Sequence, residues 1–280
     1  MLARRELPLD FWRFNHKWGA PRGRETALTE QLDILSDRLG LLPESVQKAV
    51  KGNARYRRSI GPFAYQPNTS TRTYEYPWAH SQLGDLGPSR VLEIGGALSG
   101  LQFVLAEDGH EVHNVDPFFD YGTGDYDVDP IKEHSALNEL FGTNVVLHRA
   151  TLPEADLTGK FAAILCISTI EHLSKDDVEA TLLAAKDLMA PGGLLVLTVD
   201  LFLNLAPFCL RTSNVWGTNA SVAWMEEILG WEMVAGDREE LYGYPEFSTE
   251  NILGQLEIFA IGVDYPQMAQ LVTFRAPGGP

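Results

Sequence analysis

The sequence predicts an α/β protein built on a doubly wound, mostly parallel sheet of seven strands, preceded by a helical cap. Two observations predict this class. From about residue 90 onward, short apolar runs alternate with segments whose apolar residues recur at helical spacing. The helical segments also end at glycines or follow proline and small polar residues, as helix ends commonly do. Alternation of this kind is typical of a parallel sheet covered by helices on both faces.

The expected strands are the apolar runs 91–94, 112–115, 145–149, 161–167, 194–199, 231–234 and 271–274. The helices between them are expected at 99–108, 130–141, 176–189 and 221–229. Asp129 is expected to cap the second of these helices, with Pro130 at its first position and Gly142 at its end.

Residues 1–83 precede this alternation, and we expect them to form a helical cap that contributes to the substrate region. Within the cap, helices are expected at 25–39 and 43–50, and the aromatic side chains of residues 11–18 are expected to pack on the body. Residues 84–280 then form the main domain. An irregular insertion at about 236–270 separates its last two strands.

The composition limits the partners of the chain. Its 280 residues carry a formal net charge of −16, and such a surface repels phosphate backbones, so nucleic acid is not an expected partner. The two cysteines do not form a disulfide framework, and neither a signal peptide nor an apolar run of roughly 18 residues is visible. We therefore expect a cytoplasmic protein that does not bind membranes.

The stretch from residue 90 to residue 116 contains a strand, a glycine turn, a helix, a second strand and an acid. The first apolar run ends at Gly95 and Gly96, and the second ends at Asp116. The glycines allow a tight turn and a close approach of a ligand to the backbone. In an open α/β sheet this arrangement places a ligand over the helix N-terminus and the acid on a pair of ribose hydroxyls.

A carboxylate inside the first strand indicates the charge of that ligand. Glu93 stands two residues before Gly95, where it would repel an anionic pyrophosphate and attract a cationic ligand end. The pattern Gly95-x-Ala97-x-x-Gly100 is also a degenerate dinucleotide fingerprint, so a nicotinamide-dependent oxidoreductase is the alternative reading. Glu93 weighs against that alternative.

Two more motifs stand at defined places along the alternation. The segment Ile-Ser-Thr-Ile-Glu-His-Leu (167–173) follows the fourth strand, and Pro-Gly-Gly (191–193) precedes the fifth. Together with the first turn, these motifs resemble the class I S-adenosylmethionine-dependent methyltransferases over roughly residues 88–235. The first motif of that family reads apolar-apolar-acid-x-Gly-x-Gly-x-Gly. Here Ala97 and Ser99 replace the second and third glycines, and Gly100 follows Ser99.

The resemblance implies a Rossmann-like sheet with an antiparallel last strand, and S-adenosylmethionine as the cofactor. It also implies a set of cofactor-binding residues, namely Glu93, Gly95, Gly96, Ala97, Gly100, Asp116, Pro117, Thr151, Leu152, Ile167 and Ser168. In the family an acid after the third strand normally meets the adenine amino group. Thr151 and Leu152 stand there instead, so this contact passes to a backbone carbonyl or to Glu154.

The implied activity is methyl transfer to a small-molecule acceptor, such as a natural product or a sugar-like metabolite. A hydroxyl oxygen is the first expectation for the acceptor atom and an amine nitrogen the second. His172 follows Ser168 by four residues on the rim of the sheet. An imidazole can take up a proton at cellular pH, so His172 is the expected general base, with Glu171 orienting it.

Two other points concern partners. A cofactor-binding partner protein without catalysis is an alternative, and a homodimer is a candidate assembly. No metal site is expected, although Asp125, Asp127 and Asp129 alternate as in a calcium loop. Pro130 and Ala136 occupy the positions at which such a loop needs glycine and glutamate.

Overall fold

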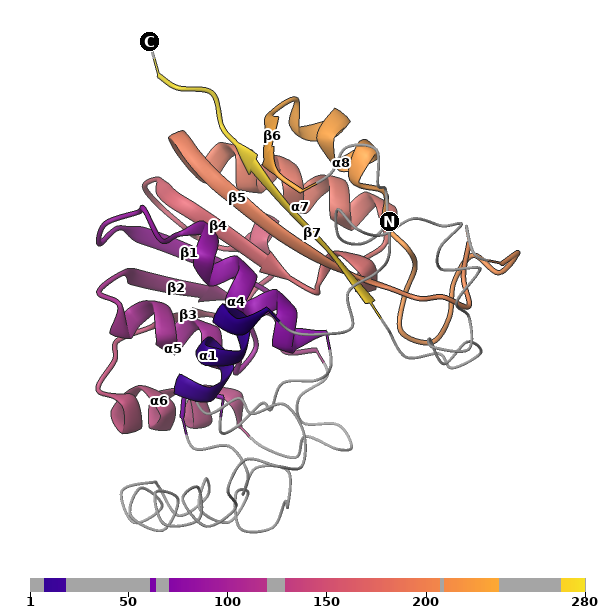
Figure 1. Ribbon diagram of the computed structural model, residues 1–280. Helices are drawn as coiled ribbons and strands as arrows, with labels where there is room; N and C mark the ends of the chain where they lie inside the picture. The colour runs from indigo at the N-terminus through magenta and orange to yellow at the C-terminus, as the bar shows by residue number, and fades with distance from the viewer. Residues whose placement is uncertain are drawn as a thin grey trace.

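The computed structural model describes residues 8–18, 61–63, 71–119, 129–206, 209–236 and 268–279 (Figure 1). Its centre is a seven-stranded sheet with the strand order β3-β2-β1-β4-β5-β7-β6. The last strand, β7, is antiparallel to both of its neighbours, and the remaining pairings are parallel. The predicted fold class is therefore confirmed. The helices expected at 25–39 and 43–50 and most of the 236–270 insertion lie outside the described residues.

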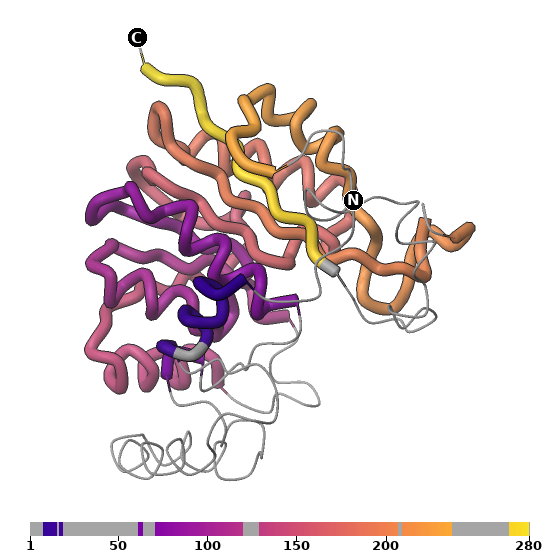
Figure 2. Tube along the Cα trace, in the orientation of Figure 1, coloured from indigo at the N-terminus to yellow at the C-terminus, as the bar shows by residue number. Residues whose placement is uncertain are grey.

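The strands are β1 Arg90–Ile94, β2 Glu111–Val115, β3 Val146–His148, β4 Phe161–Ile167, β5 Met189–Leu201, β6 Glu232–Ala235 and β7 Met268–Arg275. The described α-helices are α1 Leu9–Lys17, α4 Arg72–Gln82, α5 Gly100–Glu107, α6 Pro130–Phe141, α7 Lys175–Leu188 and α8 Val222–Leu229. Two 3₁₀ turns, η2 Leu152–Glu154 and η3 Ile170–His172, follow β3 and β4. The path of the chain in Figure 2 shows how β7, from the C-terminal end, runs between β5 and β6.

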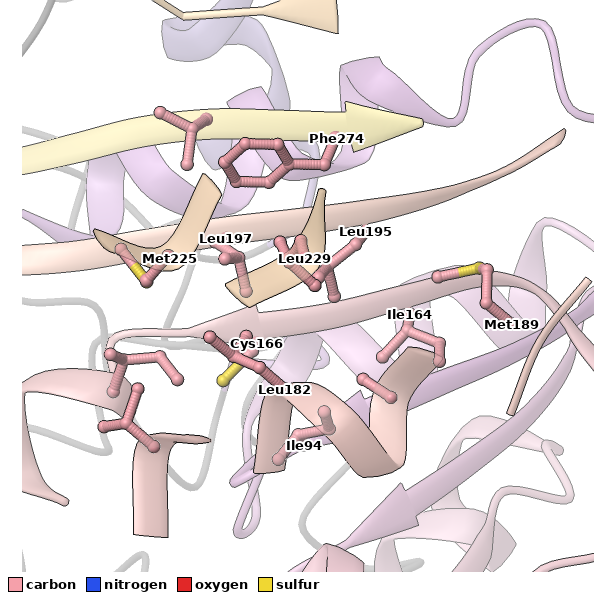
Figure 3. Packing of buried hydrophobic residues seen from close by; sticks show 14 of the residues in the cluster. Ile94, Ile164, Cys166, Leu182, Met189, Leu195, Leu197, Met225, Leu229 and Phe274 are labelled. Carbon is pink, nitrogen blue, oxygen red and sulfur yellow. The ribbon is translucent and has the colours of Figure 1, made fainter. Parts of the chain in front are cut away.

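Side chains of alternate residues in the central strands pack into two separate hydrophobic cores, one on each face of the sheet. Val91 and Leu165 belong to the core beneath α1, α4, α5 and α6. Their neighbours Leu92 and Ile164 belong to the core beneath α7 and α8, where Figure 3 shows Ile164 and Cys166 packed among leucines and methionines. Both faces of the sheet are thus covered, which explains why its strands are apolar throughout.

Most predicted element ends are close to the observed ones, and β5 is the main exception. It was expected at 194–199 but begins at Met189, because Met189 pairs with Phe161 before a shift of register. Gly192 takes a φ of +73° within this extension. The strand also continues to Leu201, because β7 provides a partner, Met268, at that position.

The predicted caps of α6 are confirmed. The Asp129 carboxylate accepts from the backbone N–H groups of Ile131 and Lys132, and Gly142 ends the helix with a φ of +64°. Asp125 and Asp127 lie outside the described residues. In the described part of the chain, no helix is long and apolar enough to cross a membrane.

Helix α4 forms although Pro77 lies inside it. Proline has no N–H, so the carbonyl of Thr73 cannot receive the usual helical hydrogen bond. The buried side chain of Asn15 in α1 donates to this carbonyl at 2.7 Å instead. Phe14 of the same helix packs on Phe63, with ring centroids 6.1 Å apart. The predicted packing of this N-terminal segment on the body is confirmed for these residues.

We expect Asn15→Ala to lower the free energy of unfolding by about 1–3 kcal/mol, because the Thr73 carbonyl would stay buried without this donor. Urea denaturation monitored by circular dichroism measures the change. Leu9→Ala, at a side chain 60% exposed on the same helix, is the matched control and should change stability by less than about 0.5 kcal/mol. Equal effects of the two substitutions would contradict the role of Asn15.

Candidate active site

The turns that follow β1, β2 and β4 share an unusual backbone conformation. Among the described residues other than glycine, positive φ angles occur at Ala97 (+43°), Phe118 (+55°) and Ser168 (+46°). Each follows the carboxyl end of one of three adjacent strands. Such strain persists where the surroundings enforce it, and it concentrates at ligand sites. The carboxyl edge of the sheet is also where open α/β folds bind their ligands.

The glycines of the first turn have little room around them. Gly95 has a φ of +69°, and a Cβ placed there would lie 2.4 Å from Oγ1 of Thr169. A Cβ on Gly96 would lie 2.8 Å from both the Glu93 carboxyl carbon and the Asn114 side-chain oxygen. A side chain at either position would have to displace Thr169, Glu93 or Asn114, so only backbone occupies this part of the carboxyl edge.

Glu93 lies beneath this turn. Its carboxyl group is 1% exposed, and Oε1 accepts from the Ser99 hydroxyl at 2.9 Å. Oε2 of Glu93 and Oδ1 of Asn114 have no hydrogen-bond partner within the described part of the protein. Burial raises the pKa of Glu93 to about 8, and the charge of Asp116 adds to this shift.

Asp116 joins the turns after β1 and β2. Oδ2 accepts from the backbone N–H of Ala97 at 2.8 Å, and Oδ1 accepts from the N–H of Phe118 at 2.7 Å. These bonds hold Ala97 and Phe118, two residues with positive φ, and Phe118 directly follows the half-buried Pro117. A carboxylate oxygen can accept more than one hydrogen bond, so a carboxylate at this position is a suitable acceptor for a ligand hydroxyl.

A polar network that the sequence analysis missed supports the Ala97 carbonyl. Asn114 of β2 donates to it at 2.8 Å and Gln102 of α5 at 3.2 Å. His134 of α6 lies 2.9 Å from Oε1 of Gln102, and burial lowers the pKa of His134 to about 4, so a neutral ring donates this bond. The available signal was the presence of Asn114 and Gln102 within otherwise apolar patterns.

The two residues expected near the adenine have different environments. The Thr151 hydroxyl donates to the exposed carboxylate of Glu154 at 2.7 Å, so that carboxylate already has a partner at the start of η2. Leu152 is buried and packs in the core with Val115 and Ile170. Both follow β3, whose last residue, His148, accepts from the backbone N–H of Asp116.

The turn after β4 brings Ile167 and Ser168 to the same edge. Both are buried, and the Ser168 hydroxyl lies 2.5 Å from both Oε1 of Glu171 and Oδ2 of Asp200. Asp200 ends the part of β5 that was predicted, but neither it nor its partner Arg72 of α4 was assigned to the site. Arg72 and Asp200 are separated by 128 positions in the chain, so no local pattern could connect them.

His172 lies on the rim and its side chain is 41% exposed. Nδ1 is hydrogen-bonded to the backbone carbonyl of Trp216. A carbonyl can only accept, so Nδ1 carries the hydrogen of the neutral ring and Nε2 holds the lone pair. Nε2 is 3.7 Å from Glu171, too far for an ordinary hydrogen bond. The main chain of Trp216, and not Glu171 as expected, therefore orients the ring by hydrogen bonding.

These features fit S-adenosylmethionine. The turn at Gly95 and Gly96 has no room for side chains, and two unpartnered buried oxygens, on Glu93 and Asn114, flank it. An acceptor oxygen suits a cationic, amino-bearing ligand better than a pyrophosphate. Among the described residues, no group of three His, Cys, Asp or Glu side chains could hold a metal ion.

Comparison with known proteins agrees with this geometry. A family model described as a methyltransferase domain matches residues 69–239, more than half of the chain. No curated protein matches the chain. This family match decides against the nicotinamide-dependent oxidoreductase that the first glycine turn left as an alternative.

Solved structures show the same fold. TehB from Haemophilus influenzae is 13% identical with a TM-score of 0.53, and the match covers 79% of this chain and 68% of that one. N-methyltransferase NodS from Bradyrhizobium japonicum WM9, in complex with S-adenosyl-L-homocysteine, is 15% identical with a TM-score of 0.50 and coverages of 88% and 98%. On the family match and this fold, the chain belongs to the class I S-adenosylmethionine-dependent methyltransferases, and S-adenosylmethionine is its cofactor.

Proposed function

We propose that this methyltransferase acts on a hydroxyl oxygen of a small molecule, with His172 as the general base. The observation that supports the proposal is the hydrogen bond from Nδ1 to the Trp216 carbonyl, which leaves the Nε2 lone pair available on a partly exposed ring. A hydroxyl must lose its proton when its oxygen is methylated, and a neutral imidazole is suited to accept that proton.

The cofactor supplies a methyl group that its sulfonium has already activated. We propose that Gly95, Gly96, Ala97 and Gly100 form the backbone surface against which it lies. Asp116 would accept from its ribose hydroxyls, with Pro117 beside it. Glu93 would attract its cationic end from below the turn.

The remaining proposed contacts lie farther along the sheet edge. Thr151 and Leu152 would border the adenine, with a backbone carbonyl or Glu154 accepting from its amino group. Ile167 and Ser168 would face the cofactor from the end of β4. The protein then contributes mainly proximity and alignment of the acceptor with the methyl group.

We further propose that residues 1–83 act as a cap and, together with the 236–270 insertion, contact the acceptor. Trp216, whose carbonyl bonds His172, exposes a large apolar side chain, and so do Leu210 and Val215 earlier in the same segment. Exposed aromatic and aliphatic side chains next to a reactive group are suited to hold the apolar part of a small ligand.

Cofactor binding is tested by titration calorimetry with S-adenosylhomocysteine and with NAD. We expect the first to bind and the second not to bind. Asp116→Ala should weaken binding by about 1.5–3 kcal/mol, since it removes a charged acceptor and also releases the N–H groups of Ala97 and Phe118. Unchanged affinity in this variant, or tight binding of NAD, would refute the assignment. Asp129→Ala, at the cap of α6, is the control.

The acceptor atom is tested by incubating the enzyme and S-adenosylmethionine with matched pairs of small molecules that differ in carrying a hydroxyl or an amine. Mass spectrometry detects the added methyl group. The proposal expects methylated hydroxyl compounds. If only the amine compounds are methylated, the acceptor atom is nitrogen and the proposal of a hydroxyl oxygen is wrong.

A further inference from the structure

A cluster of buried acids lies beside the proposed site. We call Glu75, Glu171 and Asp200, together with Arg72 and Ser168, the carboxyl cluster. The three acidic residues Glu75, Glu171 and Asp200 are 0%, 0% and 2% exposed. They come from α4, η3 and the end of β5, so the cluster joins the helix before the sheet to the edge where methyl transfer takes place.

The hydrogen bonds of Ser168 require one of these acids to be protonated. Its hydroxyl oxygen lies 2.5 Å from Oε1 of Glu171 and 2.5 Å from Oδ2 of Asp200. A serine hydroxyl has one hydrogen and can donate to one carboxylate only. An ionised carboxylate has no hydrogen to donate. The second contact is therefore a hydrogen bond only if Glu171 or Asp200 carries a proton and donates it to the serine oxygen.

The surroundings favour Glu171 as the protonated acid. Asp200 lies 3.3 Å from the Arg72 guanidinium, which provides a cation beside its carboxyl group. Glu171 has no lysine or arginine within ion-pair distance in the described part of the chain. Burial raises the pKa of Glu171 well above its ordinary value, and the charge of Asp200 raises it further. Glu75, which bonds Arg72 at 2.5 Å and accepts from Thr198, completes the cluster.

Ser168 needs this support because its backbone is strained. Its φ of +46° is unusual for a residue with a side chain. Its N–H donates to the Thr198 carbonyl at 2.9 Å, and its hydroxyl is held by the two acids. The next residue, Thr169, fills the space where a Cβ on Gly95 would lie. Movement of Ser168 would therefore reach the glycine turn of the cofactor site.

We propose that Glu171 is a positioning residue that works as a neutral carboxylic acid, donating its proton to Ser168 and thereby holding the turn after β4 against the cofactor-binding turn. The inference rests on the cofactor contacts proposed above. In the proposed arrangement Glu171 donates to Ser168, and Ser168 donates to Asp200.

The groups that act on Glu171 come from every element around it. Ser168 lies in the turn, Asp200 in β5, and Arg72 and Glu75 in α4. The Cys166 thiol of β4 and the rim residue His172 are also close. Because the pKa of Glu171 is raised, its neutral form extends to higher pH than that of an ordinary glutamate and is lost as the pH rises through the folded-state value. Ionisation would place two carboxylates around one serine hydrogen.

The experiment compares two isosteric amide substitutions in the full-length protein, Glu171→Gln and Asp200→Asn. Infrared difference spectra between the wild type and Glu171→Gln at neutral pH should show the carbonyl stretch of a protonated carboxylic acid. Titration with S-adenosylhomocysteine should give Glu171→Gln wild-type affinity at neutral pH, while Asp200→Asn binds roughly ten- to hundredfold more weakly. At alkaline pH, Glu171→Gln should bind more tightly than the wild type.

The proposal would be overturned if the protonated-acid band is absent. It would also be overturned if Glu171→Gln loses as much affinity for S-adenosylhomocysteine as Asp200→Asn does. If Asp200→Asn does not fold, the infrared band and the pH dependence of Glu171→Gln still decide it. The two proposals fail separately, because a wild type that does not bind S-adenosylhomocysteine would refute the cofactor assignment whether or not the band is present.

Discussion

Replacing His172 with alanine is expected to lower turnover by roughly 10²–10⁴-fold, which is the usual contribution of a positioned general base. The ring is on the rim, and its Nε2 lone pair is available because Nδ1 bonds the Trp216 carbonyl. Affinity for S-adenosylhomocysteine should barely change. Activity should partly return at high pH, where a hydroxyl acceptor ionises without help.

Initial rates measured with an acceptor found by mass spectrometry provide the test. His110→Ala is the matched control, because His110 lies at the amino end of β2, opposite the proposed site, and should leave turnover intact. Near-normal turnover of His172→Ala at neutral pH would exclude the base and favour an amine or an acidic acceptor. A large loss of cofactor affinity would instead assign His172 a role in shaping the site.

The sequence predicted the sheet and the first glycine turn because their signals are local. The strands of a doubly wound sheet are buried on both faces, so they stand out as apolar runs between helical patterns. Gly95, Gly96 and Asp116 belong to one strand–turn–helix–strand unit, whose spacing alone indicates a ligand edge. Asp129 and Gly142 likewise mark the ends of α6 without information from elsewhere in the chain.

The remaining features depend on contacts between distant residues. Pro77 argues against a helix in the local sequence. Helix α4 tolerates it because Asn15 donates to the carbonyl of Thr73, 58 positions away, which proline leaves without its helical partner. Arg72 meets Asp200 over a separation of 128 positions. The sequence also suggested that Glu171 orients His172, whereas its carboxyl group turns inward to Ser168. Pairings of this kind arise from packing and carry no periodic signal.

Glu93→Gln is expected to stabilise the protein and to weaken cofactor binding. Burial raises the pKa of Glu93 from 4.5 to about 8, so between these pH values the folded protein retains a proton that the unfolded chain has lost. The wild type therefore loses unfolding free energy as the pH rises through this window, by about 1.4 kcal/mol per unit from this group. Glutamine cannot ionise, so the variant lacks this loss. At the upper end of the window it should be more stable by a few kcal/mol.

The same substitution removes the charge proposed to attract the cationic end of the ligand. Glutamine can still accept from Ser99 as Oε1 of Glu93 does, so the turn keeps that bond. We expect the wild type and Glu93→Gln to bind S-adenosylhomocysteine similarly at acidic pH. The wild type should gain an advantage of roughly ten- to a hundredfold as Glu93 ionises, the size of a hydrogen bond to a charged group.

Urea denaturation and titration calorimetry across the pH window measure both effects. Glu179→Gln, an exposed position on α7, is the matched control and should follow the wild type in both experiments. Parallel stability curves for the wild type and Glu93→Gln would show that Glu93 ionises normally in the folded protein. If the stability curves of the wild type and Glu93→Gln diverge but their ligand affinities are equal, ionisation of the buried Glu93 destabilises the protein and its charge does not contact the cofactor. If Glu93 is a functional carboxylate, Glu93→Gln should be more stable than the wild type and should bind S-adenosylhomocysteine more weakly. A buried charge that serves to bind a ligand lowers the stability of the protein when the ligand is absent.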